Sequence, residues 1–131
     1  MLNNLDIFIK YDGDIEDIAD KISDLLDVKM TKEIDDVVEV QRYRFKFLDI
    51  EFVLFDNHEL EDDCGIVFTD YNYELGVIKL RIGQNYKYYD EMYDKTAMFL
   101  MEKLSYSLNA NVMLVENLQT LVMSTIPVSA S

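Results

Sequence analysis

The chain contains one cysteine, one proline, four glycines and no tryptophan in 131 residues. Because Cys64 is the single cysteine, an internal disulfide and a cysteine-rich zinc site are excluded. The scarcity of glycine and proline, with 50% hydrophobic residues, excludes collagen-like, low-complexity and disordered chains. Every apolar run is shorter than the roughly 20 residues of a membrane span, and the first residues lack the basic and apolar regions of a signal peptide. The composition predicts a single cytoplasmic domain over residues 1–131.

Basic residues are also scarce, because 12 Lys and Arg stand against 26 Asp and Glu, a net charge of −14. Two segments carry the whole imbalance. Residues 12–36 hold ten acids and three bases, and residues 56–74 hold seven acids with no Lys or Arg. The negative electrostatic potential of such a chain repels nucleic acids and anionic membranes and attracts basic proteins. We therefore expect a cationic protein partner, and neither nucleic acid nor membrane.

Two segments have the spacing of amphipathic helices. The first follows the turn residues Asp12 and Gly13, where Asp14 is expected to cap the helix. One face of this helix is apolar, and another carries Asp17, Asp20, Asp24 and Asp27. The second helix is expected over residues 89–108, with an apolar face made of Tyr93, Ala97, Leu100, Met101, Leu104 and Leu108.

Runs rich in β-branched and aromatic residues predict strands at residues 5–11, 37–57, 66–73, 77–82 and 111–115. The long run is expected to be two strands with a tight turn near Leu48 and Asp49, or one strand broken by a bulge. A bend or bulge is expected at Leu75 and Gly76. The remaining segments are interpreted as a polar connection at 28–36, a loop at 83–85, a hairpin strand or short helix at 118–123, and a loose tail at 124–131.

Sequential strands with short turns and two helices predict an α+β fold. We expect a two-layer sandwich, with a mostly antiparallel sheet of about five to six strands covered by two helices.

The segment from His58 to Cys64 is the natural place to seek a metal or catalytic site. A zinc-protease helix needs a second histidine four residues on, and Asp62 stands there. Carboxylates around Cys64 disfavour its thiolate, so we expect a thiol packed at the start of a strand rather than a nucleophile. No glycine-rich loop opens either helix. The sequence predicts a protein without catalytic residues, cofactor or metal, and hence not an enzyme.

Tyrosine beside carboxylates is typical of a protein-binding patch. This composition occurs in the second acidic segment and predicts partner-binding residues Glu59, Glu61, Asp62, Asp63, Asp70, Tyr71, Tyr73 and Glu74. In contrast, Arg42, Arg44 and Lys46 on one strand are expected to pair with acids such as Glu39 or Glu51 across the sheet, rather than to bind nucleic acid.

The central part of the chain resembles the immunity proteins of bacterial contact-dependent growth inhibition systems. The resemblance rests on YRFKFLDIEFVLF (43–55), HELEDDCGIVF (58–68) and DYNY (70–73). It implies a small, acidic, cytosolic α+β protein that binds and blocks the toxin domain of its own system, often an RNase or DNase. A monomer in a one-to-one complex is expected. The alternative is a type III secretion chaperone, which would be a dimer holding an effector segment, with the uncharged stretch 117–131 at the dimer interface.

Overall fold

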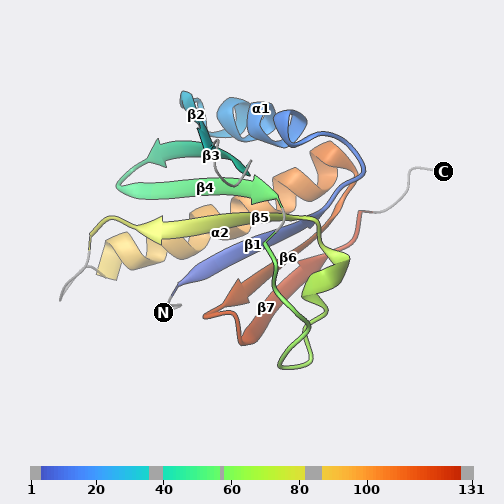
Figure 1. Cartoon of the computed structure of the whole chain (residues 1–131). Coiled ribbons are helices and arrows are strands. Elements are labelled where there is room, and N and C mark those ends of the chain that lie inside the picture. Colours follow the sequence, from blue (N-terminus) through green and yellow to red (C-terminus); the bar gives the residue numbers. More distant parts are fainter. Residues whose placement is uncertain (1–3, 36–39, 57, 82–86, 128–131) are drawn as a thin grey trace.

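The computed structural model describes residues 4–35, 40–56, 58–81 and 87–127. In these residues two α-helices and a seven-stranded sheet form two layers, with each strand antiparallel to its neighbours in the order β2-β3-β4-β5-β1-β6-β7 (Figure 1). The expected α+β class is confirmed, with one strand more than the upper expectation. The elements are β1 (Leu5–Lys10), α1 (Ile15–Leu26), β2 (Met30–Asp35), β3 (Val40–Phe47), β4 (Ile50–Asp56), a 3-10 turn (Phe68–Asp70), β5 (Tyr73–Lys79), α2 (Lys87–Leu108), β6 (Asn111–Glu116) and β7 (Thr120–Thr125).

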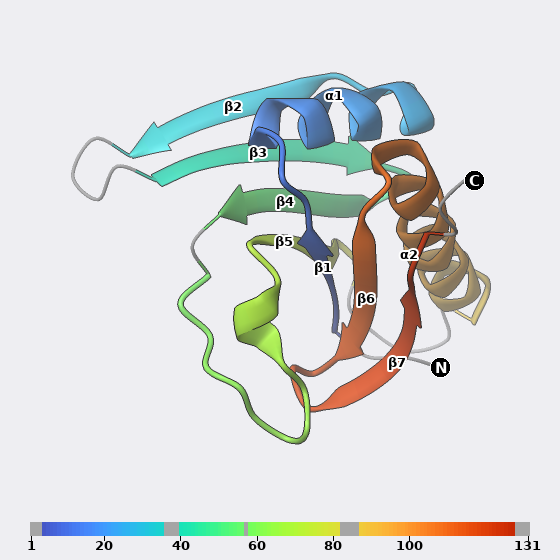
Figure 2. The same ribbon diagram turned by 90° about the vertical axis from the view of Figure 1, so that its right-hand side faces the viewer.

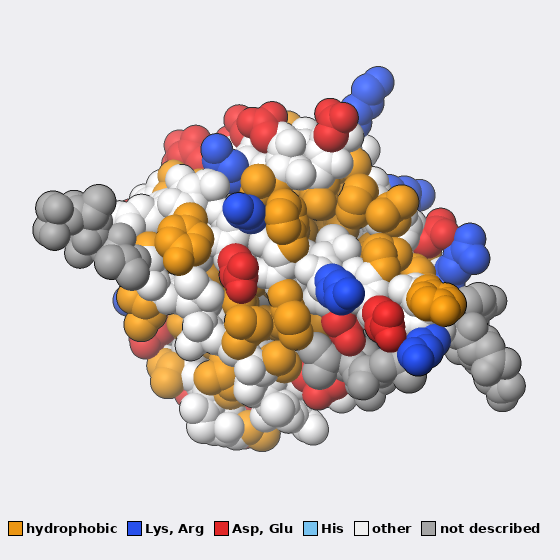
Figure 3. Space-filling model, turned by 180° about the vertical axis from the view of Figure 1, so that it is seen from behind, with side chains coloured by type: hydrophobic (Ala, Val, Ile, Leu, Met, Phe, Trp, Pro, Cys, Tyr) orange, Lys and Arg blue, Asp and Glu red, His pale blue; other side chains and the backbone are white. Residues whose placement is uncertain are grey.

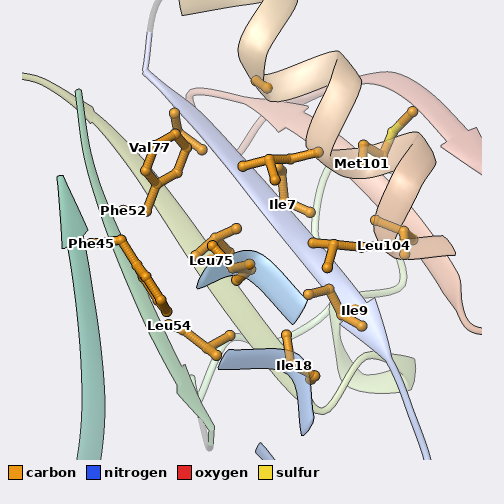
Figure 4. Close-up of a cluster of buried hydrophobic side chains, with 14 of the residues drawn as sticks. Ile7, Ile9, Ile18, Phe45, Phe52, Leu54, Leu75, Val77, Met101 and Leu104 are labelled. Atoms are coloured by element: carbon orange, nitrogen blue, oxygen red, sulfur yellow. The ribbon is translucent and has the colours of Figure 1, made fainter. Parts of the chain in front are cut away.

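Both helices pack on the same face of the sheet, and the main core lies between the two layers. The sheet contributes alternate residues, such as Ile7 and Ile9 of β1, because successive side chains of a strand point to opposite faces. Ile18 of α1 and Leu104 of α2 close over them (Figure 4). The expected apolar faces of both helices are confirmed. Asp14 occupies the N-cap position of α1, where its carbonyl oxygen accepts the Asp17 amide, but its side chain makes no capping hydrogen bond.

The additional strand is β2, which we had interpreted as a polar connection. It pairs with β3 at the edge of the sheet, Met30 opposite Phe45 and Lys32 opposite Tyr43. Edge strands commonly carry charge, which discourages pairing between molecules. The described side chains of β2, residues 30–34, are all exposed, so its sequence has no apolar alternation by which it could be predicted.

Residues 66–73 do not form the expected strand. Ile66 makes an isolated bridge with Asp63, and Phe68 begins the 3-10 turn. The strand begins later, at Tyr73, and runs without interruption through Gly76, where a bend was expected. A Cβ atom on Gly76 would lie 3.5 Å from Oδ1 of Asp6, an ordinary van der Waals contact, so Gly76 lies directly beside this carboxyl group.

The two segments for which the sequence allowed alternative structures, residues 37–57 and 118–123, both form hairpins. Leu48 and Asp49 both have positive φ, 47° and 60°, and join β3 directly to β4 as a tight turn. Residues 117–119, with positive φ at Asn117 and Leu118, join β6 to β7. The segment expected at 118–123 is therefore a hairpin strand and not a helix, and it begins at Thr120. Ser124 and Thr125 belong to β7 rather than to a tail. The expected loop at 83–85 lies outside the described residues.

A tyrosine hydroxyl completes the pairing of the two central strands. Leu5 faces Val77 where β1 meets β5. The hydroxyl of Tyr93, from α2, accepts a hydrogen bond from the Leu5 amide at 2.8 Å and donates one to the Val77 carbonyl. Tyr93 is fully buried, so its hydroxyl group joins the helix layer to the centre of the sheet.

Candidate functional site

The second acidic segment forms a loop across the face of the sheet opposite α2 (Figure 2). We call residues 58–72 the acidic loop. A second, smaller core fixes it, in which Ile66 and Phe68 pack on Phe8, Met113 and Val115 of the sheet. The loop is therefore held by apolar contacts despite its polar composition.

Hydrogen bonds within the acidic loop define its course. Nδ1 of His58 accepts the Leu60 amide at 2.9 Å, and Nε2 donates to the Tyr71 carbonyl at 2.7 Å. The Asp62 carboxylate accepts both the amide and the hydroxyl of Thr69, at 3.0 and 2.9 Å. His58 and Asp62 are thus structural residues of the loop, and His58 also stacks edge-on against Phe8.

Four carboxylates of the acidic loop gather round one hollow of about 600 Å³. Its wall is completed by Leu60 and Phe68 and by the β6–β7 turn, residues 117–119. We call this site the acidic hollow; its carboxylates are Glu59, Glu61, Asp62 and Asp63, and all four residues are exposed. A hollow lined by carboxylates on an anchored loop has the chemistry to receive Lys or Arg side chains.

The other expected partner-binding residues lie apart from the hollow. Asp70 is exposed and Tyr71 is half-buried. Tyr73 and Glu74 are each only 9% exposed, Tyr73 within the main core, where its hydroxyl donates to the Gly13 carbonyl, and Glu74 on the opposite face of β5. Tyr73 reaches the surface at the wall of a second hollow, which Glu59 and Tyr71 also line, and Tyr73 and Glu74 both expose little side-chain area to a partner.

Glu74 instead forms a carboxyl pair with Asp6 that the sequence analysis missed. The two side chains are hydrogen-bonded beside Gly76. Burial, with repulsion from Asp6, raises the pKa of Glu74 to about 8, while burial raises the pKa of Asp6 to about 6. The two carboxyl groups therefore titrate as a pair that holds one proton at neutral pH, in the hydrogen bond between them. The signal in the sequence that could have revealed this pair is the single acidic residue among the apolar residues of each strand.

This pair predicts a stability that falls as the pH rises. The folded chain binds the Glu74 proton more tightly than the unfolded chain does, so stability is lost as pH increases from about 4.5 to about 8. Glu74→Gln keeps a donor for Asp6 and has no proton to lose. We expect it to exceed the wild-type free energy of unfolding by on the order of 2 kcal/mol at about pH 9 and to match it at about pH 5.

Urea unfolding at the two pH values measures this difference. Glu102→Gln on the exposed side of α2 removes the same charge and serves as the control, with no comparable pH-dependent gain. An equal gain for both variants would assign the effect to net charge rather than to the Asp6–Glu74 pair.

Two further expectations concern single residues. Arg44 pairs with Glu51, as expected, and also with Glu33 of β2 at 2.8 Å, whereas Glu39 lies outside the described residues. Cys64 is exposed on the acidic loop, with φ of 52°, and is not packed at the start of a strand as expected. Within the described ranges, no three His, Cys, Asp or Glu side chains converge in a way that would hold a metal ion.

The opposite side of the molecule carries an apolar groove between the two helices. Leu25 and Leu26 of α1, Phe47 of β3, and Met92 and Phe99 of α2 line it. Figure 3 shows hydrophobic side chains gathered over this face among charges of both signs. This groove differs in chemistry from the acidic hollow.

Neither helix in the described part of the chain combines the length and apolar content needed to cross a bilayer. The sequence matches no model of a known protein family, and no curated protein matches it at a significant level.

Proposed function

We propose that this chain is an immunity protein of a bacterial contact-dependent growth inhibition system. In this proposal it binds the cationic toxin domain of its own system one-to-one in the cytoplasm and blocks it without catalysing a reaction. The observation that carries the proposal is the exposure of four carboxylates round one hollow, in a segment without Lys or Arg.

The physical chemistry of nuclease toxins supports this assignment. A nuclease binds a polyanion, so its active-site surface is commonly basic. An acidic protein competes for that surface and associates rapidly through electrostatic steering. The residues proposed to contact the toxin domain are those of the expected set whose side chains are exposed or half-buried: Glu59, Glu61, Asp62, Asp63, Asp70 and Tyr71.

Co-expression tests the proposal directly. The toxin domain encoded beside this chain, expressed in bacteria that lack an immunity gene, should stop growth, and this chain should restore it. Growth that remains arrested although the folded chain is present in excess contradicts the proposal.

Salt should slow association of the two purified proteins. Raising the ionic strength from 0.01 M to 0.15 M shortens the Debye length from about 30 Å to about 8 Å. We expect the association rate constant to fall about tenfold or more, with a much smaller change in the dissociation rate constant, as measured by stopped-flow fluorescence. An association rate that does not respond to salt would contradict an electrostatically steered complex.

The apolar groove favours a second candidate, a chaperone of the type III secretion class that holds an effector segment. A bound apolar segment would cover Met92 and Phe99, and binding would persist at high salt. Phe99→Asp separates the candidates, because it would abolish chaperone binding and leave neutralisation of the toxin unchanged.

A further inference from the structure

The two edges of the sheet differ in charge. On one edge, β2 carries Lys32, Glu33 and Asp35 in six residues. On the other edge, β7 has the sequence TLVMST, and every residue after Glu116 is uncharged. Charged residues on edge strands prevent pairing with other chains. The β7 edge lacks this protection, in a protein that is otherwise rich in charge.

The β7 edge is also open and partly apolar. Among the described residues, β7 pairs with β6 on one side and has no strand on the other. The Ser105 hydroxyl of α2 lies 3.4 Å from the Thr125 carbonyl oxygen, at the C-terminal end of the strand. Leu121 is 48% exposed and Ile126, immediately after the strand, is 73% exposed. β7 bulges at Val122, where its register with β6 shifts by one residue, and it pairs regularly on both sides of this position. An open, uncharged edge is a template for an added strand on the regular segments that flank the bulge.

The acidic hollow lies at one end of the same edge. The β6–β7 turn, residues 117–119, leads into β7 at Thr120 and also lines the hollow. An extended segment lying along β7 would therefore bring one of its ends to Glu59, Glu61 and Asp63. Charge complementarity selects Lys or Arg at that end.

We propose that β7 receives an extended segment of the cationic partner as an eighth, antiparallel strand, with basic residues that follow the segment entering the acidic hollow. This inference rests on the proposed function for the identity of the partner. Antiparallel addition continues the pattern of the sheet and places the C-terminal end of the segment at the N-terminal end of β7. A second copy of this chain is a poorer occupant, because it brings another net charge of −14 to the edge.

Peptides of defined charge test the site without the toxin. The probe is an acetylated and amidated peptide of alternating Thr and Val with two lysines at its C-terminal end. Its controls are the same peptide with the lysines at the N-terminal end, and with glutamates in their place. Amide NMR spectra of the full chain measure binding and the protection of residues 120–125 from hydrogen exchange.

We expect the peptide with C-terminal lysines to bind at least tenfold more tightly than either control and to protect the β7 amides. Leu121→Lys should weaken this binding about tenfold or more. Ile34→Lys on the opposite edge, which makes the same change at a residue 59% exposed, should leave binding unchanged.

Binding without protection of β7, equal affinity for both lysine peptides, or no binding would overturn the proposed strand addition. Protection that grows with protein concentration in the absence of peptide would assign the edge to a second copy. Growth rescue by the Leu121→Lys variant at the wild-type level would overturn strand addition while leaving the immunity function in place. Loss of rescue by the wild-type chain would instead contradict the function itself.

Discussion

Replacing Glu59, Glu61 and Asp63 with lysine is expected to weaken binding of the toxin domain by about 4 kcal/mol or more, roughly a 1,000-fold rise in Kd. The three carboxylates line one hollow, so a basic partner would desolvate them together. Disturbing a single buried interfacial charge pair typically costs about 2–5 kcal/mol. Titration calorimetry against the toxin domain measures the loss. Asp62 is left unchanged because its carboxylate bonds twice to Thr69, seven residues away, and so holds the loop, whereas the Asp63 carboxylate accepts the amide of the next residue, Cys64.

A matched reversal separates the local effect from net charge. Replacing Asp12, Asp20 and Asp24 with lysine changes the net charge by as much as the loop variant does, but in the first acidic segment. All three residues are exposed. We expect this control to slow association slightly and to leave the dissociation rate constant unchanged. If it weakens binding as much as the loop variant does, the acidic loop is not the contact surface.

Tyr93→Phe is expected to destabilise the fold by about 3 kcal/mol. The substitution removes the hydroxyl that pairs with the Leu5 amide and the Val77 carbonyl, both at buried residues. Each buried backbone group left without a partner costs about 1–3 kcal/mol. For a chain of this size the melting temperature should fall by about 10 °C.

Urea unfolding and calorimetry of the Tyr93→Phe variant measure this loss. Tyr106→Phe, at an exposed position of the same helix, is the control and should change stability by less than about 0.5 kcal/mol. A loss below about 1 kcal/mol at Tyr93 would mean that Leu5 and Val77 close the gap by bonding to each other, since they face one another in the ladder.

Local sequence patterns predicted the two helices, β1 and β6, and placed β3 and β4 within one long run. Both helices have a continuous apolar stripe and β3 alternates regularly, whereas β4 is apolar from Phe52 to Phe55, so its limits were set by the turn at Leu48 and Asp49 rather than by periodicity. β2 was missed because an edge strand buries little and carries charge. The run beginning at Ile66 was assigned to a strand because its apolar residues serve another purpose, packing a loop onto the sheet.

The candidate site was also predictable only in part, because some of its residues are positioned by pairing between strands rather than by local sequence. The acidic loop was predictable from its density of charge, because carboxylates are normally exposed whatever the tertiary fold. Local sequence does not specify which face of β5 a residue occupies, so the interior positions of Tyr73 and Glu74 became visible only in the sheet. The Asp6–Glu74 pair joins β1 and β5, which lie far apart in the chain. It depends on the register in which these two strands pair, and local sequence does not specify that register.

The acidic loop divides its residues between two tasks. Leu60, Ile66 and Phe68 hold it to the sheet, whereas Glu59, Glu61 and Asp63 extend from it. Substitutions in the second group leave the small core intact, and of the three only that of Asp63 removes a side-chain hydrogen bond within the loop as the structure describes it, the one to the Cys64 amide. The loop therefore keeps its anchor on the sheet while its recognition residues change. Such a loop can be retargeted: a library randomised at these three positions, selected against a different basic domain, would change specificity on an unaltered scaffold.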